Sequence, residues 1–295
     1  MRPMTLGSEC YACLQQLVAL TVDLACADLK AQHQAHQAAC QVLDREFGPV
    51  AIPALIANRL LPVIYQVSRN PDPFAARKTA ATALAAKMLR LLAPAYGDDL
   101  ESLLRLAAAG NALDFFRGAK EVSQEMQARI AFGISQLSDF RQDLAGPPGL
   151  LLCLADNAGE QFFDRPLVDY LRRQRWEVLY VVKGGPIQND LTRQDLEASG
   201  AADALAPVVD TGAQTVGLEL AATSPEFQKL FDAARIILAK GMGHFETMSH
   251  LQDPRVWFLL QAKCAPVARS LGVERNTFVF IRTPAISLDT AGQTN

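Results

Sequence analysis

The pattern of hydrophobic and polar residues changes near the middle of the chain. In residues 8–142, apolar residues recur every three or four positions and Ala, Leu, Gln and Arg are abundant, which predicts at least five helices. One of them should be a long helix that follows Pro73 and runs to Leu92. Proline lacks an amide hydrogen and disfavours helical backbone in the residue before it. Breaks are therefore predicted at Pro53, at Pro62, in residues 70–73 and in residues 94–98.

After about residue 146, short apolar runs alternate with amphipathic segments. The apolar runs have the length and composition of strands and lie at residues 150–155, 178–182, 236–239, 256–260 and 278–281. The amphipathic segments are candidates for helices that connect parallel strands, at residues 161–173, 192–199, 225–234 and 265–271. This order predicts an α/β protein with a layered α/β/α sheet. We expect a helical domain in residues 1–146 and the sheet domain in residues 147–295.

Composition and charge narrow the function classes. The chain has 295 residues, with 28 Lys and Arg against 31 Asp and Glu, so its formal net charge is −3. This balance argues against a nucleic-acid binder. No apolar run reaches the roughly 18 residues of a membrane span, and the amino terminus lacks the apolar core of a secretory signal. Six cysteines are too few for a disulfide framework, so we expect a cytoplasmic protein that does not act on membranes.

Three polar clusters follow predicted strands. Ligands of open α/β sheets bind beyond the carboxyl ends of the strands, so these clusters are the first candidates for chemistry. They are Asp-Asn-Ala-Gly-Glu at residues 156–160, Lys-Gly-Gly-Pro-Ile-Gln-Asn-Asp at residues 183–190, and Lys-Gly-Met-Gly-His-Phe-Glu at residues 240–246. The topology should bring all three together at one edge of the sheet.

Oxygen-bearing side chains in the first two clusters suggest a cation site. Asp156 and Asn157 can hold a hard cation at a strand end, and Asp190 can supply a third oxygen ligand. Each has an ordinary alternative, because Asp156 can simply cap a helix and Asp190 can mark a helix start. Glu160 is either a base near the site or an acid favoured by the helix dipole.

The third cluster suggests an anion contact. Lys240 follows an apolar run and is next to Gly241 and near Gly243, which allow close backbone approach to a phosphate or carboxylate. Oxygen ligands without Cys or His favour Mg²⁺ or Mn²⁺ over zinc, and such ions commonly act on phosphate groups. Together the clusters predict a metal-dependent phosphomonoester hydrolase.

The order and spacing of these clusters resemble the signature of the metal-dependent damage-control phosphatases, also called the acidic-residue-methyltransferase-like family. The resemblance extends to Cys-Tyr-Ala-Cys-Leu at residues 10–14, to Asp-Pro-Phe at residues 72–74 with Lys78, and to Ala-Gly-Asn-Ala-Leu-Asp at residues 109–114. It covers nearly the whole chain. It implies a Rossmann-like three-layer α/β/α domain preceded by an all-helical domain, a bound divalent metal, and release of phosphate from small phosphorylated metabolites.

The resemblance also implies roles for single residues. Asp156, Asn157 and Asp190 would be the metal ligands, and Lys240 would contact the phosphate. These four residues are the expected catalytic group.

Further residues would bind the substrate. Asn111 and Asp114 would approach the cleft from the helical side, and Glu160 and Glu246 are additional candidates. His244 stands where the family commonly has Asn. A histidine there can donate to a substrate oxygen or shift the metal preference toward softer ions, so Co²⁺ and Ni²⁺ are considered beside Mg²⁺ and Mn²⁺.

Cys10 and Cys13 form a C-x-x-C pair without a second pair at zinc-site spacing. Both structural packing and an accessory metal or redox site are open for them. Two alternatives to the phosphatase also stay open. One is an S-adenosylmethionine-dependent carboxyl methyltransferase, although residues 156–160 contain a single glycine where a nucleotide-cradling loop usually has several. The other is a non-catalytic metal-binding or scaffold protein.

Overall fold

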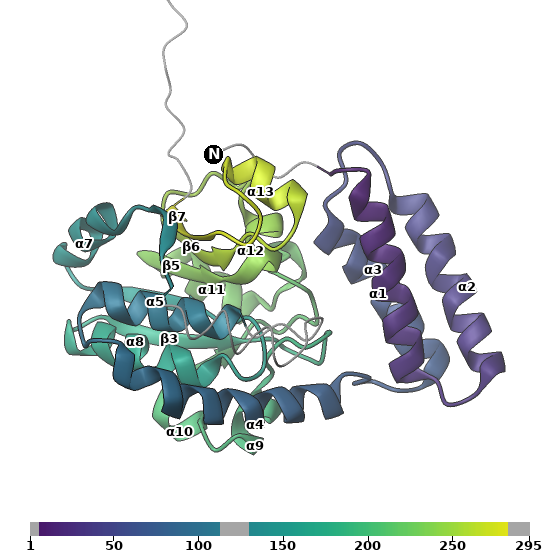
Figure 1. Ribbon diagram of the computed structural model, residues 1–295, viewed down its shortest axis with the longest axis horizontal. Coiled ribbons are helices and arrows are strands. Elements are labelled where there is room, and N and C mark those ends of the chain that lie inside the picture. The colour runs from purple at the N-terminus through teal and green to yellow at the C-terminus, as the bar shows by residue number, and fades with distance from the viewer. Residues whose placement is uncertain (1–5, 113–129, 283–295) are drawn as a thin grey trace, which may run out of the picture.

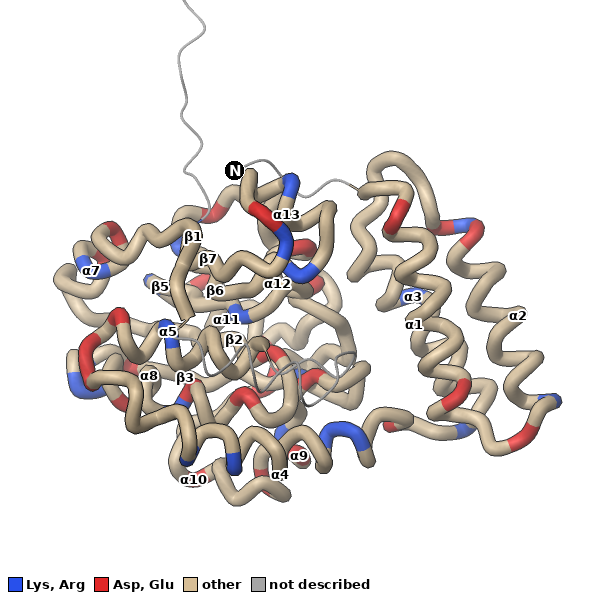
Figure 2. Tube along the Cα trace, in the orientation of Figure 1, with Lys and Arg blue, Asp and Glu red and all other residues tan. Residues whose placement is uncertain are grey.

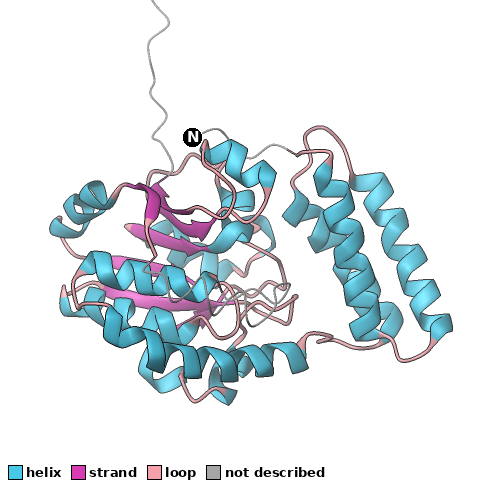
Figure 3. Cartoon of the chain, viewed as in Figure 1, coloured by secondary structure: helices cyan, strands magenta, loops and turns pink. Residues whose placement is uncertain are grey.

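The computed structural model describes residues 6–112 and 130–282 (Figure 1). A helical region comes first in the chain and is followed by a seven-stranded sheet with helices on both faces (Figure 3). The predicted α/β architecture is therefore confirmed. Asp114, a predicted substrate contact, lies outside the described residues.

The first three helices form a unit with its own apolar core, here called the three-helix unit. It consists of α1 (Glu9–Ala25), α2 (Leu29–Glu46) and α3 (Pro53–Ser68). Asp28 caps α2 by accepting a hydrogen bond from the amide of Ala31. In Figure 1 the unit lies beside the rest of the protein and is joined to it through residues 69–74.

The prediction of a helix break at Pro62 is wrong, because this residue lies inside α3. Pro53, in contrast, is the first residue of the helix, where a missing amide hydrogen costs nothing. Leu60, Leu61 and Ile64 around Pro62 are fully buried in the core of the three-helix unit. Burial of these side chains on both sides of the proline outweighs the hydrogen bond that it removes.

The next two helices pack on the sheet. The long helix expected after Pro73 is α4 (Ala75–Leu92), and after a short 3₁₀ turn (Ala93–Ala95) the chain enters α5 (Leu100–Asn111). A Cβ atom on Gly110 of α5 would lie 3.0 Å from the side chain of Phe163 in α8 (Gln161–Arg173), which shows how closely the two helices approach each other. The helical region is therefore divided between the three-helix unit and two helices that cover the sheet.

A strand that the sequence pattern did not indicate lies in the predicted helical half. This strand, β1 (Phe132–Ser135), pairs in parallel with the last strand, β7 (Phe278–Arg282). It has only four residues and alternates between half-buried and exposed side chains, so it lacks a hydrophobic run. The predicted domain boundary at residue 146 stays a prediction, with β1 and the following α7 (Leu137–Ala145) on its amino-terminal side.

The strand order of the sheet is β1-β7-β6-β5-β2-β3-β4. All pairs are parallel except β6 with β7, which are antiparallel. The strands not yet given are β2 (Leu150–Leu154), β3 (Glu177–Val182), β4 (Val208–Asp210), β5 (Ile236–Lys240) and β6 (Val256–Gln261). The helices not yet given are α9 (Arg193–Ala198), α10 (Ala202–Leu205), α11 (Pro225–Ala233), α12 (Gly241–Met248) and α13 (Ala265–Leu271).

The antiparallel pairing corrects the expectation that residues 265–271 cross between parallel strands. Helix α13 spans only 7 residues, and the chain then turns at Gly272, whose φ of 69° is left-handed. The chain therefore returns to pair antiparallel with β6. Strand β4 was also not anticipated, because it has only three half-buried residues.

Neighbouring residues of each strand enter opposite apolar layers. Leu151 and Cys153 of β2 belong to the core under α4, α5 and α7 to α10, whereas Leu152 and Leu154 belong to the core under α11 to α13. This is the two-residue period of a strand that is buried on both faces. It explains why β2, β3, β5 and β6 appear in the sequence as continuous apolar runs.

Charged residues of both signs are interspersed along the trace (Figure 2). Among residues 6–112 and 130–282, no helix is both long and apolar enough to cross a bilayer.

An aromatic cluster anchors α7 to the sheet and generates a stability prediction. The ring of Phe140 is fully buried, with its centroid 4.9 Å from Trp257 and 5.1 Å from Phe280. We expect Phe140→Ala to lower the free energy of unfolding by about 3–5 kcal/mol in urea titrations, because it removes these contacts and leaves a cavity. Leu91→Ala, at a side chain that is 73% exposed, is the control and should change it by less than about 0.5 kcal/mol. Equal stability of the two variants would contradict the prediction.

Candidate active site

The carboxyl ends of β2 and β5 meet at the point where the order of strands reverses. Strand β2 pairs with β3 on one side and with β5 on the other, and such a switch point is where α/β proteins bind ligands. Asp156 follows β2 and Gly241 follows β5. A Cβ atom on Gly241 would lie 1.9 Å from Asp156 Oδ2, and Gly241 has a φ of 81°, so only glycine fits there. The close backbone approach expected at this glycine is therefore made to the Asp156 carboxylate.

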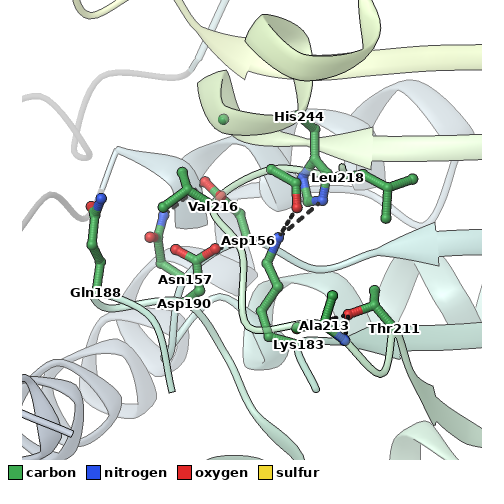
Figure 4. A network of polar contacts seen from close by, with 12 residues as sticks. Asp156, Asn157, Lys183, Gln188, Asp190, Thr211, Ala213, Val216, Leu218 and His244 are labelled. Atoms are coloured by element: carbon green, nitrogen blue, oxygen red, sulfur yellow. Dashed lines mark hydrogen bonds and ion pairs between the residues drawn. The ribbon is translucent and has the colours of Figure 1, made fainter. Parts of the chain in front are cut away.

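The three predicted metal ligands lie side by side (Figure 4). Asn157 and Asp190 form an isolated antiparallel bridge, and the Leu191 amide donates to the carbonyl oxygen of Asp156 over 2.8 Å. Asn157 Nδ2 donates to Asp156 Oδ2, also over 2.8 Å. The sheet edge thus joins residues from the first and second sequence clusters.

Asp190 has a buried oxygen that faces the ammonium group of Lys183. Its Oδ2 is buried without a hydrogen-bond partner, and it lies 3.3 Å from Lys183 Nζ. Burial raises the pKa of Asp190 to about 6, although the charge of Lys183 opposes this shift. Lys183 Nζ donates to the carbonyl oxygen of Gly217 over 2.5 Å, which holds the ammonium group in place.

Asp156 is also in an unfavourable environment for a carboxylate. Burial raises its pKa well above the usual range, and the nearby Glu160 and Asp190 raise it further. A cation between these groups would offset their repulsion. The oxygen of Asn157 accepts a hydrogen bond from Asn189 Nδ2 over 2.5 Å and keeps a second lone pair. This all-oxygen donor set, in which the buried Asp190 Oδ2 makes no hydrogen bond, fits a hard divalent cation.

The amide of Asn157 is necessary for such a site. Among the residues that the structure describes, no three side chains of His, Cys, Asp and Glu are grouped to hold a metal ion. The candidate site therefore depends on Asn157 together with Asp156 and Asp190.

Lys240 lies beneath this site in a buried ionic network. Its Nζ is 2.6 Å from Glu160 Oε2 and also pairs with Asp164, which accepts a hydrogen bond from Tyr180 Oη over 2.7 Å. Burial would raise the pKa of Glu160, but the charge and hydrogen bond of Lys240 lower it below its usual value. Asp164 keeps a pKa of about 6, because burial raises it more than Lys240 lowers it.

Asn111, for which the family resemblance implies a substrate contact, connects this network to the helical region. Its Nδ2 donates to Asp156 Oδ2 over 2.8 Å and to Glu160 Oε1 over 3.0 Å. Its own oxygen accepts from the amide of Gln261 at the end of β6 over 3.3 Å. Helix α5 thereby fixes the orientation of both carboxylates.

His244 lies behind Lys183. Its Nδ1 is 2.6 Å from the carbonyl oxygen of Lys240, to which it donates, and its Nε2 is 3.4 Å from Lys183 Nζ. Burial and the charge of Lys183 lower the pKa of His244 well below its usual value, so the ring is neutral. Its free nitrogen can therefore accept from Lys183.

A cavity of about 390 Å³ lies between the three-helix unit and the sheet edge. Glu246, also a predicted substrate contact, lines it and accepts a hydrogen bond from the Ala54 amide over 3.0 Å. Among the described residues the lining does not include Lys240, Glu160 or His244. The wall is formed by Cys13, Leu14, Gln16, Leu17, Pro53, Ala54, Ala57, Asn111, Asp156, Asn157, Gln188, Asn189, Asp190, Val216, Met242, Gly243, Glu246 and Lys263.

Sequence reasoning assigned no role to four residues of this site. Lys183 and Asn189 lie inside a cluster that the sequence pattern singled out. Lys263 lines the cavity and lies shortly after the end of β6. Because ligands of α/β sheets bind beyond the carboxyl ends of the strands, this position was the available signal. Asp164 lies four residues after Glu160, on the same side of α8, and this helical spacing was the available signal.

The cysteines are all free. Cys13 is exposed and lines the cavity, whereas Cys10 is buried against the core under α11 to α13. Packing therefore accounts for Cys10.

Comparisons with known proteins show the family of the chain. The family model described as the damage-control phosphatase ARMT1-like domain matches residues 7–279. The damage-control phosphatase PH1575 of Pyrococcus horikoshii is 32% identical over 279 residues, which cover 93% of this chain and 96% of that protein. A damage-control phosphatase of Archaeoglobus fulgidus is 27% identical over 278 residues, covering 92% and 96%.

The fold is also similar to a solved structure. The crystal structure of a DUF89 family protein (PH1575) from Pyrococcus horikoshii matches with a TM-score of 0.86 at 32% identity, and the match covers 95% of this chain and 99% of that chain. The family match spans nearly all of the chain and includes every residue of the candidate site that the structure describes. The chain therefore belongs to the damage-control phosphatase ARMT1-like family.

Proposed function

We propose that this protein is a divalent-metal-dependent phosphatase that hydrolyses phosphomonoesters of small metabolites, such as sugar phosphates or phosphorylated cofactor fragments. The observation that carries the proposal is the grouping of Asp156, Asn157 and Asp190 in the wall of a cavity, where the buried Oδ2 of Asp190 makes no hydrogen bond and lies 3.3 Å from Lys183 Nζ. Family membership supports phosphatase activity, and the donor set supports the metal.

Asp156, Asn157 and Asp190 are the proposed ligands, and Mg²⁺ or Mn²⁺ suits their oxygen atoms best. Co²⁺ and Ni²⁺ are included among the ions to be tested. When bound, such an ion supplies Lewis acidity and charge neutralisation for a phosphoryl group.

The chain itself offers positive potential for the phosphate. Lys263 lines the cavity, and its charge lowers the pKa of Asp156 and of Glu160. Met242 and Gly243, in the first turn of α12, line it too, and first-turn amides have no acceptor within their own helix. These groups can stabilise charge on the phosphoryl oxygens.

The size and lining of the cavity support a small substrate. Its volume of about 390 Å³ is in the range of small-molecule sites. Leu14, Leu17 and Ala57 give it an apolar wall from the three-helix unit, and Gln16 and Glu246 add polar groups that can bind hydroxyls.

The first test is phosphate release from an aryl phosphate and a panel of sugar phosphates with Mg²⁺, Mn²⁺, Co²⁺ or Ni²⁺. We expect release that a chelator abolishes and that Asp190→Asn or Asp156→Asn lowers by roughly 100-fold or more, because a ligand is weakened. Asp203→Asn on the exposed side of α10 is the matched control and should act as wild type.

Folded protein that releases no phosphate with any of these ions would overturn the proposal. Binding of S-adenosylmethionine without metal would then favour a methyltransferase, and metal binding without turnover a non-catalytic protein.

For Lys240 the buried ionic network favours a supporting role over the expected phosphate contact. We propose that it acts through Glu160, which accepts from Asn111 and Asn157 and so orients both amides. Lys240→Met should then lower the free energy of unfolding by about 3–5 kcal/mol in urea titrations, because Glu160 and Asp164 lose their buried counter-charge. Lys87→Met, on the exposed surface of α4, is the control. Unchanged stability with a raised KM would instead indicate a direct phosphate contact.

Glu246 gives the protein a pH-dependent stability. Burial raises its pKa from 4.5 to about 7. Between these values the folded protein holds a proton that the unfolded chain releases, so this group's contribution to stability falls as the pH rises. Burial raises the pKa of its neighbours Cys10, Cys13 and Cys264, so these thiols stay neutral in this range.

We therefore expect Glu246→Gln to be increasingly more stable than wild type as the pH rises from about 5 to 7. The difference should grow by roughly 1–2 kcal/mol and then level off, as thermal unfolding at each pH would show. Glu226→Gln on the exposed surface of α11 should show no such trend. A difference that does not change with pH would refute the assignment.

A further inference from the structure

The segment that presents Asp190 begins in contact with the three-helix unit. The side chain of Ile187 is fully buried in the apolar core of that unit. Gln188 has a φ of 44°, a left-handed backbone conformation that residues with a side chain rarely adopt. Its amide donates to Tyr65 Oη of α3 over 3.2 Å. The strained turn before Asp190 is therefore held from outside by α3.

The same segment ends at α9, which is held by α4. Thr192 caps α9 in a capping box with Asp195. Asp195 Oδ2 also accepts from Lys78 Nζ over 2.7 Å, and Lys78 is 1% exposed. The second partner of Lys78 is Asp72, at 2.7 Å, in the connector between α3 and α4. One buried ammonium group therefore joins the connector to the start of α9.

Only a short stretch of backbone separates these two contacts. Within it, the Asp190 amide donates to the carbonyl oxygen of Ile187 over 3.0 Å, and the Leu191 amide donates to that of Asp156 over 2.8 Å. Asp190 therefore cannot move toward or away from Asp156 without a change at one of the two ends.

We propose that Tyr65 and Lys78 are positioning residues for Asp190, and that they make the placement of the amino-terminal helices a condition for the assembly of the metal site. The inference rests on the proposed function in that it takes Asp190 as a metal ligand. It also gives a role to the Asp72-Pro73-Phe74 motif and Lys78. Both ion pairs form only if Asp72 in the connector and Asp195 at the start of α9 lie next to Lys78 of α4.

Tyr65→Phe is the decisive variant, because the ring keeps its place in the core and only the acceptor for the Gln188 amide is lost. Tyr11→Phe is the matched control. It removes a tyrosine hydroxyl in the same three-helix unit, and that hydroxyl donates to Asp44 of α2 instead of supporting the Gln188 amide. Lys78→Gln is a second variant at the other end, but it leaves two carboxylates without their cation and can unfold α4.

The first measurement is hydrogen exchange without metal. We expect the amides of Asp190 and Leu191 to exchange about 10-fold faster or more in Tyr65→Phe than in wild type or Tyr11→Phe. The Gln188 amide loses its own acceptor in Tyr65→Phe, so faster exchange at Gln188 does not show whether Asp190 is affected. Unchanged exchange at Asp190 and Leu191 would overturn the inference, whatever the protein's activity.

The second measurement is Mn²⁺ affinity by calorimetric titration, with the Mn²⁺ dependence of phosphate release. Loss of a supporting group of this kind typically weakens metal affinity by about 10- to 100-fold. We expect Tyr65→Phe to need that much more Mn²⁺ and to recover its kcat at saturating Mn²⁺. A lower melting temperature with unchanged Mn²⁺ affinity would overturn the inference, since it indicates a structural role only. If wild type binds no Mn²⁺ while exchange at Asp190 is still accelerated, the positioning role stands and the proposed function fails.

Discussion

Burial of several carboxylates at one edge of the sheet is the constraint on which the rest of the structure depends. Glu160, Asp164 and Asp190 are buried there beside the half-buried Asp156, and a buried carboxylate is stable only when it is paired or hydrogen-bonded. Lys240 compensates Glu160 and Asp164, and Lys183 lies next to Asp190. The Asp156 side chain accepts hydrogen bonds from the side-chain amides of Asn111 and Asn157, and it lines the cavity.

The amino-terminal helices contribute to this site in two separate ways. Helix α5 packs on the sheet and fixes Asp156 and Glu160 through the amide of Asn111. The three-helix unit closes one side of the cavity and contacts the segment that carries Asp190. The helical region has the pattern of one domain in the sequence, but its parts have two roles. Helix α5 supports the carboxylates of the site, and the three-helix unit encloses the cavity.

Most regular elements could be predicted from the sequence, because their periodicity is a direct result of burial. The strands β2, β3, β5 and β6 are buried on both faces and appear as apolar runs, and α8 and α13 lie where the amphipathic pattern indicated. The missed strands, β1 and β4, are short and half-exposed, so they carry no such pattern. The break expected at Pro62 failed because packing around α3 outweighs the local effect of proline.

The sequence by itself determined the class of fold, the family and the three polar clusters at the strand ends, because hydrophobic periodicity and residue type are local properties. Only the tertiary structure decided what each side chain does there. Lys240 and His244 follow the same strand as Glu246, yet the first two are buried behind the site and the third lines the cavity. The positions of Lys183, Lys263 and Tyr65 relative to the candidate site depend on contacts between segments that are far apart in the chain. Such contacts are set by the packing of whole elements, which no local pattern of residues records.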